Sequence, residues 1–202
     1  MSERDTFVLA DVELARVVDR ITDGQWDQQL PPEFPTLGDQ TYTVREIVGY
    51  LAYDEAWVPA MVAGQRMEEV GADAFGEPIG GDLLGDDPAT RYRELVDTSI
   101  EAITALDEED LDRRVVHFTY GDHPAREAIA HLATFRGLRV HDLGRALGQD
   151  HPMSDELVTG LWEMLVPRFE EYRAAGVFGE PVEVGGDATL TARLLAATGR
   201  QP

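Results

Sequence analysis

Apolar residues recur at every third or fourth position along most of the chain, which is the spacing of helices that bury one face. The one stretch dominated by β-branched and aromatic residues is VVHFTYG, residues 115–121, which predicts a single short strand or an extended arm. The pattern predicts helices at residues 6–23, 43–63, 88–106, 124–147, 154–175 and 188–198. We therefore expect an all-α fold, a four-helix bundle with additional C-terminal helices and long loops. It should form one domain over 1–202, with an antiparallel bundle core at about 6–147 and C-terminal helices within 154–198.

Residues that favour helix N-caps indicate where several of these helices begin. Thr43 is followed three positions later by Glu46, which is the pattern of a capping box. Pro59 should kink the second helix, residues 64–86 should form a long crossover loop, and EEDLDR at 108–113 should form a polar turn. The other expected N-caps are Asp87, Asp122, Ser154 and Asp187.

The longest predicted helix, 124–147, has a charged residue within its apolar face. Arg139 points within about 40° of the direction shared by five apolar residues. An isolated buried charge costs several kcal/mol, so Arg139 should have partners. Asp142 lies one turn away. Two further candidates, Tyr50 and Asp54, lie one turn apart on the second helix and are singled out by the family resemblance given below. The five apolar residues are Ala128, Leu132, Phe135, Leu143 and Ala146.

This expected cluster of Arg139, Asp54, Asp142 and Tyr50 has two interpretations. It can be a polar clasp that holds two helices in register, which the sequence slightly favours because structural ion pairs are common. Alternatively, Arg139 binds an anionic ligand in a pocket, and Tyr50 or Asp54 acts as an acid or base. An open cavity on the order of several hundred Å³ beside Arg139 would favour the pocket.

Composition narrows the classes of partner. The chain has 39 acidic residues against 17 basic ones, all Arg, and a net charge of −22. This balance argues against nucleic acid and against an anionic membrane surface, because both would be repelled. With no Cys, disulfides, thiolate metal sites and a Cys nucleophile are excluded. No stretch approaches the ~20 apolar residues of a membrane span, and the N-terminus does not resemble a signal peptide, so we expect a cytoplasmic protein.

Motifs for catalysis or metal binding are scarce. The sequence has no Gly-rich phosphate loop, nucleophile elbow, HExxH or EF-hand loop. Of the five His, no two are three or four residues apart, so His alone cannot form a metal pair on one helix. His123 and His151 precede Pro and should lie in loops, whereas His131 and His141 should be surface or interface residues. Small residues that share the His141 face, Gly137 among them, should allow close helix packing either within the bundle, which is favoured, or across a dimer contact. The fifth is His117.

Three segments carry a resemblance to a known family: YTVREIVGYL (42–51), FRGLRVHDLGRALG (135–148) and RAAGVFGEPVEV with ATLTARLLAATGR near the C-terminus. The chain resembles the DinB-like helical bundles, in particular the actinobacterial group similar to the N-terminal domain of mycothiol-dependent maleylpyruvate isomerase. In metal-binding members the ligands are a His on the second helix and a Glu-x-x-x-His on the long helix. The matching positions are Tyr50, Phe135 and Arg139, so the resemblance implies that the family's metal is absent, and we expect no metal.

The resemblance implies an isomerase or a thiol transferase that acts on a small, anionic molecule. The candidate catalytic residues are Tyr50, Asp54 and Arg139, and the candidate ligand-binding residues are Trp57, Phe135 and Asp142. Mycothiol as a cofactor rests on the resemblance alone. The alternative is a non-catalytic bundle that binds a ligand or partner, with Arg139 as the polar clasp. Such bundles are often homodimers, and Trp26, Trp57 and Trp162 are candidates for the contact surface.

Overall fold

The computed structural model describes residues 1–35, 40–150 and 153–202. The all-α prediction is confirmed, because helices dominate these residues and the strands form one two-stranded sheet. His151, predicted to lie in a loop, falls outside the described residues. In chain order the elements are α1 (Glu3–Val18), η1 (Asp23–Gln25), α2 (Val44–Val62), α3 (Met67–Val70), α4 (Pro88–Thr104), α5 (Glu108–Arg113), β1 (Val115–Phe118), β2 (Gly121–Pro124), α6 (Ala125–Ala146), α7 (Asp155–Leu165), η2 (Val166–Arg168), α8 (Phe169–Ala174) and α9 (Leu190–Ala197).

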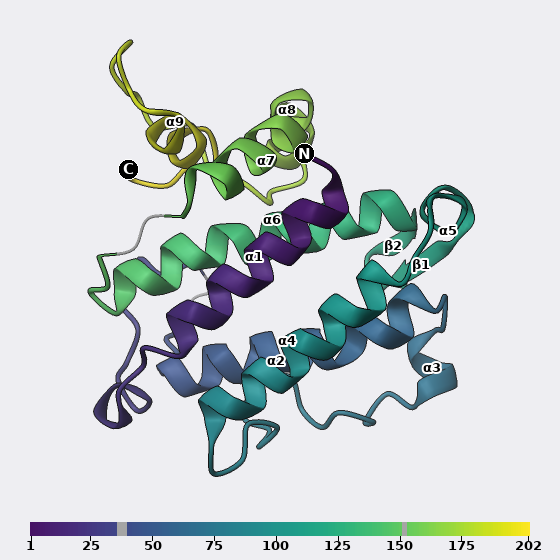
Figure 1. Cartoon of the computed structure of the whole chain (residues 1–202). Helices are drawn as coiled ribbons and strands as arrows, with labels where there is room; N and C mark the ends of the chain where they lie inside the picture. Colours follow the sequence, from purple (N-terminus) through teal and green to yellow (C-terminus); the bar gives the residue numbers. More distant parts are fainter. Residues whose placement is uncertain (36–39, 151–152) are drawn as a thin grey trace.

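Helices α1, α2, α4 and α6 form the bundle (Figure 1). α1 packs along α6, α2 packs along α4, and α1 also contacts α4. Their apolar faces supply most of the buried core, including Leu14, Leu51, Tyr92 and Leu143. The second helix begins with the predicted capping box of Thr43 and Glu46, and Pro59 lies inside α2 without ending it.

The bundle is not simply antiparallel, which corrects the prediction from sequence. Gln149, just after α6, bonds the carbonyl of Val17 at the end of α1, and Arg126 near the start of α6 pairs with Glu3, so α1 and α6 run parallel. α2 and α4 also run parallel, because the crossover of residues 63–87 returns the chain to the starting end of α2 (Figure 1). The neighbouring pairs α1/α4 and α2/α6 are antiparallel (Figure 1).

The C-terminal helices cover the α1/α6 side of the bundle, away from α2 and α4 (Figure 1). Gly137 makes this contact close, because a Cβ at that position would lie 2.7 Å from Leu161 of α7. Gly160 does the same against Thr6 of α1, with a Cβ at 2.6 Å. The small-residue face of α6 is therefore used within the chain, as predicted.

The region around Asp122 differs from the prediction. Residues 115–118 and 121–124 form an antiparallel hairpin in which Val116 pairs with His123, whereas one strand or an arm was expected. The expected cap, Asp122, is paired in this hairpin, and Pro124 occupies the N-cap position of α6. The Asp122 carboxylate instead contacts the His117 Nδ1 at 2.7 Å.

Two other boundaries also differ from the prediction. The predicted polar turn is the helix α5, because Asp107 caps it by accepting a hydrogen bond from the Asp110 N–H. The fifth predicted helix is interrupted at Pro167, as the proline predicts, and η2 divides it into α7 and α8. The last helix begins after Thr189, whose hydroxyl accepts from the Ala192 N–H, so the expected cap at Asp187 is wrong. Asp87 and Ser154 cap α4 and α7 as predicted.

Two of the three Trp residues are buried within the chain, Trp26 with 9% and Trp57 with 5% of the residue exposed. They therefore do not offer the contact surface that the sequence suggested for a homodimer. None of the helices in the described part of the chain is long and apolar enough to span a membrane.

Candidate functional site

The face between α2 and α6 is filled by long side chains, in contrast to the closely packed pairs α1/α6 and α2/α4. Two arginines of α6, Arg136 and Arg139, lie there three residues apart. They have different surroundings, and the difference separates the two interpretations of the sequence.

Arg136 is the clasp at the centre of the bundle. Its side chain is 1% exposed, and its Nε lies 2.6 Å from Glu55 Oε1 on α2 and 3.0 Å from Asp11 Oδ1 on α1. The guanidinium also lies over the Phe7 ring, 5.5 Å from the centroid. One side chain thus ties α1, α2 and α6 together, the role that the sequence assigned to Arg139.

The electrostatics of this clasp depend on burial. Burial raises the pKa of Asp11 well above its usual value, and the nearby Glu55 charge raises it further, against the effect of Arg136. Burial alone would lower the pKa of Arg136, but Glu55, Asp11 and Asp54 hold it above its ordinary value. One guanidinium thus faces two buried carboxyl groups, and burial disfavours the charged form of Asp11.

Sequence reasoning missed this clasp, although a signal was present. Asp11 lies three positions before the core residue Leu14, and Glu55 lies three before Val58, so both carboxylates fall on apolar helix faces. Two acidic residues at core positions require a buried cation. Arg136, seven positions after the core residue Ile129, is the residue that meets them.

Arg139 makes one ion pair where Arg136 makes two, although both Nη atoms of Arg136 also have no hydrogen-bond partner among the described residues. Its side chain is 12% exposed, and Nη1 lies 3.5 Å from Asp142 Oδ2. The guanidinium lies 5.0 Å from the ring centroids of both Phe34 and Phe135. Burial lowers the pKa of Arg139, and the Asp142 charge opposes this shift. Within the described part of the chain, the buried Nη1 has no hydrogen-bond partner.

Asp142 is already neutralised by another residue. Arg200, near the C-terminus, donates two parallel hydrogen bonds to it, from Nε to Oδ1 at 2.8 Å and from Nη2 to Oδ2 at 2.9 Å. A bidentate pair of this kind is the strongest form of the interaction. The group of Arg139, Arg200 and Asp142 therefore has two positive charges and one negative charge, and the excess positive charge is at Arg139.

Tyr50 and Asp54 line the α2 side and are both half-buried. The Tyr50 ring meets Phe135 edge-on with centroids 6.3 Å apart, and burial, with the Asp54 charge, raises the pKa of Tyr50 to about 12. Burial raises the pKa of Asp54 to about 6, although Arg136 opposes this shift. Among the described residues, Arg139 makes its ion pair with Asp142 alone, so the expected pair with Asp54 does not form. Trp57 packs against Phe75 instead, with ring centroids 4.8 Å apart.

The three positions that the resemblance matches to metal ligands, Tyr50, Phe135 and Arg139, do lie together. They present a phenol, a phenyl ring and a guanidinium. A phenyl ring cannot ligate, and a guanidinium stays protonated and repels a cation. These side chains do not fit a divalent metal.

A second group of polar side chains, missed by sequence reasoning, lies at the first turns of α6. His123, Glu127 and His131 have one potential ligand atom each within 4.8 Å of the others. Because His123 was expected in a loop and lies eight positions from His131, the spacing rule for two His on one helix did not detect it.

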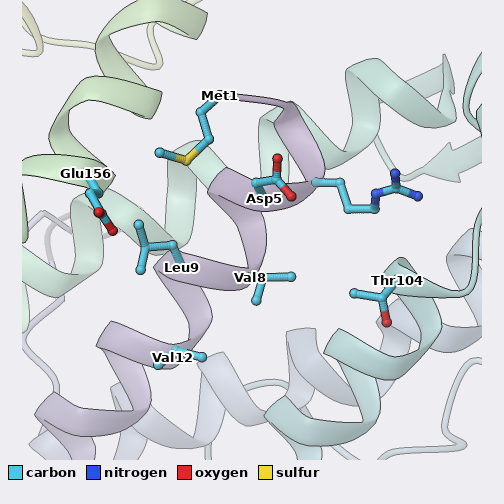
Figure 2. Close-up of a pocket in the computed structure, with 8 residues that line it drawn as sticks. Met1, Asp5, Val8, Leu9, Val12, Thr104 and Glu156 are labelled. Atoms are coloured by element: carbon cyan, nitrogen blue, oxygen red, sulfur yellow. The ribbon is translucent and has the colours of Figure 1, made fainter.

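Two grooves lie away from Arg139. The first, of about 430 Å³, runs between α1, α4 and α7, with Val8, Leu9 and Val12 along α1 and Met1 above them (Figure 2). The second, of about 690 Å³, is bordered by Arg126, Glu127, Arg168 and residues around them. Neither groove includes Tyr50, Asp54 or Arg139 in its lining.

Comparison with known proteins agrees with this architecture. A family model described as the DinB superfamily matches residues 7–141, which is more than half of the chain and includes most of α1, all of α2 and α4, and most of α6. Searches of curated proteins and of solved structures returned no match. Because the family match covers the bundle apart from the start of α1 and the end of α6, the chain belongs to the DinB superfamily.

Proposed function

We propose that the chain binds a small anionic molecule between α2 and α6, with Arg139 holding the anionic group. One observation carries the proposal: the buried Arg139 Nη1 has no hydrogen-bond partner among the described residues, while its neighbour Asp142 is neutralised by Arg200. A buried cation without a full set of acceptors is costly, and an incoming carboxylate would supply them.

The surroundings favour a ligand with an apolar body. Phe34 and Phe135 lie on the Arg139 guanidinium, and Tyr50 presents its ring edge to Phe135. Such a site suits a carboxylate attached to a flat or unsaturated carbon skeleton. Arg136 supplies a clasp between α1, α2 and α6, which supports a separate, ligand-binding role for Arg139.

Catalysis is supported by the two α2 residues. A carboxyl group whose pKa is about 6 can both accept and donate a proton near neutral pH, which suits Asp54 as a general base. The Tyr50 phenol stays protonated and can donate a hydrogen bond to a developing oxyanion. Isomerisation or thiol transfer, the activities implied by the resemblance to the actinobacterial isomerase group, would need a thiol from a small molecule such as mycothiol, because the chain has no Cys.

Calorimetric titration tests the binding site. The probes are benzoate, phosphate and the uncharged benzamide, and the proteins are wild type, Arg139→Gln and Arg145→Gln. Arg145 is the matched control, because it lies on α6 but is exposed. A charge-assisted hydrogen bond contributes about 1.5–3 kcal/mol, so Arg139→Gln should weaken benzoate binding roughly 10- to 100-fold.

Arg145→Gln should bind benzoate like wild type, and benzamide should bind to none of the three proteins. The proposal is wrong if wild type binds neither benzoate nor phosphate, or if Arg139→Gln binds them as tightly as wild type. Turnover separates an enzyme from a binding protein: Asp54→Asn should retain benzoate binding and lose thiol-dependent isomerisation of a cis-unsaturated dicarboxylate.

A further inference from the structure

We propose that His123, Glu127 and His131 form a binding site for Zn²⁺ or a similar divalent transition metal at the start of α6. The site is separate from the ligand site proposed at Arg139 and does not depend on the proposed function. It also departs from the expectation that the chain holds no metal, which was drawn for Tyr50, Phe135 and Arg139.

The distances approach those of a coordination sphere. Glu127 Oε1 lies 3.5 Å from His123 Nδ1 and 3.7 Å from His131 Nε2. Zinc with bonds of about 2.0–2.1 Å and tetrahedral angles places neighbouring ligand atoms about 3.3–3.5 Å apart. Small side-chain rotations would therefore bring all three atoms onto one ion. Two imidazoles and a carboxylate are a common donor set for zinc, and they leave one position open.

Rigid elements hold the three residues. Glu127 and His131 are one turn apart on the same face of α6, and His123 is fixed in β2 by its pairing with Val116. The two imidazole rings meet edge to face, with centroids 4.8 Å apart. A metal there would join the hairpin directly to the helix that follows it.

The orientation of His131 exposes a free ligand atom to this cluster. Its Nδ1 lies 3.4 Å from the Tyr120 hydroxyl, which can hold the proton on that nitrogen. Its Nε2 is buried and, in the described part of the chain, has no hydrogen-bond partner. A partner on one ring nitrogen that leaves the other free is the usual arrangement around a metal-binding His.

The groove bordered by Glu127 and Arg168 offers a path for the ion from solvent.

Arg168 is the residue that most opposes metal binding at this cluster. Its Nη2 lies 2.8 Å from Glu127 Oε1, so it competes with a metal for the same oxygen. It is also held by Glu171, through Nε to Oε2 at 3.0 Å and Nη2 to Oε1 at 2.9 Å. Arg168 can therefore keep the Glu171 pair when Glu127 turns to a metal, and removing its charge should strengthen metal binding.

The test is a calorimetric titration of Zn²⁺ into metal-stripped protein that has no polyhistidine tag. The absorption spectrum of the protein with Co²⁺ in place of Zn²⁺ reports the geometry of the ligands. Wild type should bind one equivalent, and His123→Ala and His131→Ala should each bind at least 100-fold more weakly. His141→Ala is the matched control, because His141 is also a half-buried His of α6 but lies outside the cluster, and it should bind like wild type.

The His variants could also lose binding because they misfold, and Arg168→Gln separates these causes. We expect Arg168→Gln to bind Zn²⁺ at least tenfold more tightly than wild type, a gain that unfolding cannot produce. The proposal is overturned if wild type binds no stoichiometric Zn²⁺, if both cluster variants bind it like wild type, or if His141→Ala loses binding equally.

Discussion

Replacing Arg136 by Met should destabilise the fold strongly and in a pH-dependent way. The change removes the cation that faces Glu55 at 2.6 Å and Asp11 at 3.0 Å, while Met keeps much of the apolar volume. Breaking one side of a buried ion pair costs about 3–5 kcal/mol, because the remaining charge is uncompensated. Domains of this size have about 5–15 kcal/mol of stability, so the variant should still fold.

The pH dependence follows from the carboxylates. Without Arg136, a buried carboxylate can avoid its charge only by keeping a proton, so its folded-state pKa rises above the unfolded value. The stability gained from that proton is present at low pH and is lost as the pH rises toward the folded-state pKa. The difference from wild type should therefore grow by up to about 1.4 kcal/mol per pH unit above about pH 5.

Urea unfolding followed by circular dichroism at pH 5, 6, 7 and 8 measures this dependence. Arg139→Met is the matched control and should cost less than about 1.5 kcal/mol, because Asp142 keeps its pair with Arg200. Adding Glu55→Gln and Asp11→Asn to Arg136→Met should recover more than half of the loss, since no buried charge remains. A loss below about 1 kcal/mol in Arg136→Met at pH 8, or one independent of pH, would refute the clasp.

Three further outcomes are expected. Asp54 has a folded-state pKa of about 6, above its ordinary 3.8, so its contribution to stability is present below pH 4 and is lost as the pH rises through 6. In urea unfolding, the stability of Asp54→Asn relative to wild type should therefore rise by up to about 3 kcal/mol between pH 4 and 8, and a difference that does not change with pH would contradict this. Gly137→Ala places a Cβ 2.7 Å from Leu161 and should lower the free energy of unfolding, measured by thermal unfolding, by about 1–3 kcal/mol. Adding Leu161→Ala should relieve part of this loss, and an unchanged stability in the single variant would show that α7 shifts without cost to make room for the methyl group. Arg200→Gln frees Asp142 to pair with Arg139 and should weaken benzoate binding about tenfold in calorimetry, whereas unchanged affinity would mean that Arg139 is not tuned by this pair.

The helices could be predicted from sequence because their signals are local. Thr43 and Glu46 specify the start of α2 within one turn, and the spacing of apolar residues defines the buried faces. The parallel course of α1 and α6 is not local, because it depends on where the long crossover after α2 returns the chain. The hairpin before α6 likewise depends on pairing between strands, which overrides the capping preference of Asp122.

The candidate site could be predicted only in part. The pattern identified an arginine on the buried face of α6, the family resemblance matched it with Tyr50 and Phe135, and these residues do meet. Which of two arginines three positions apart is buried depends on how the helix is rotated, and an error of a few tens of degrees exchanges them. Arg200 could not be connected to Asp142, because 58 residues separate them and their contact depends on how the C-terminal segment folds back.

The central claim is that Arg136 is structural and Arg139 binds the ligand. Nitrogen-15 NMR of the arginine Nε–H groups tests it most directly, with the two signals assigned from Arg136→Met and Arg139→Gln and followed during titration with benzoate. The account predicts a saturable shift of the Arg139 signal and a stationary Arg136 signal. Movement of Arg136 with Arg139 unchanged, or no movement of either signal, would contradict it.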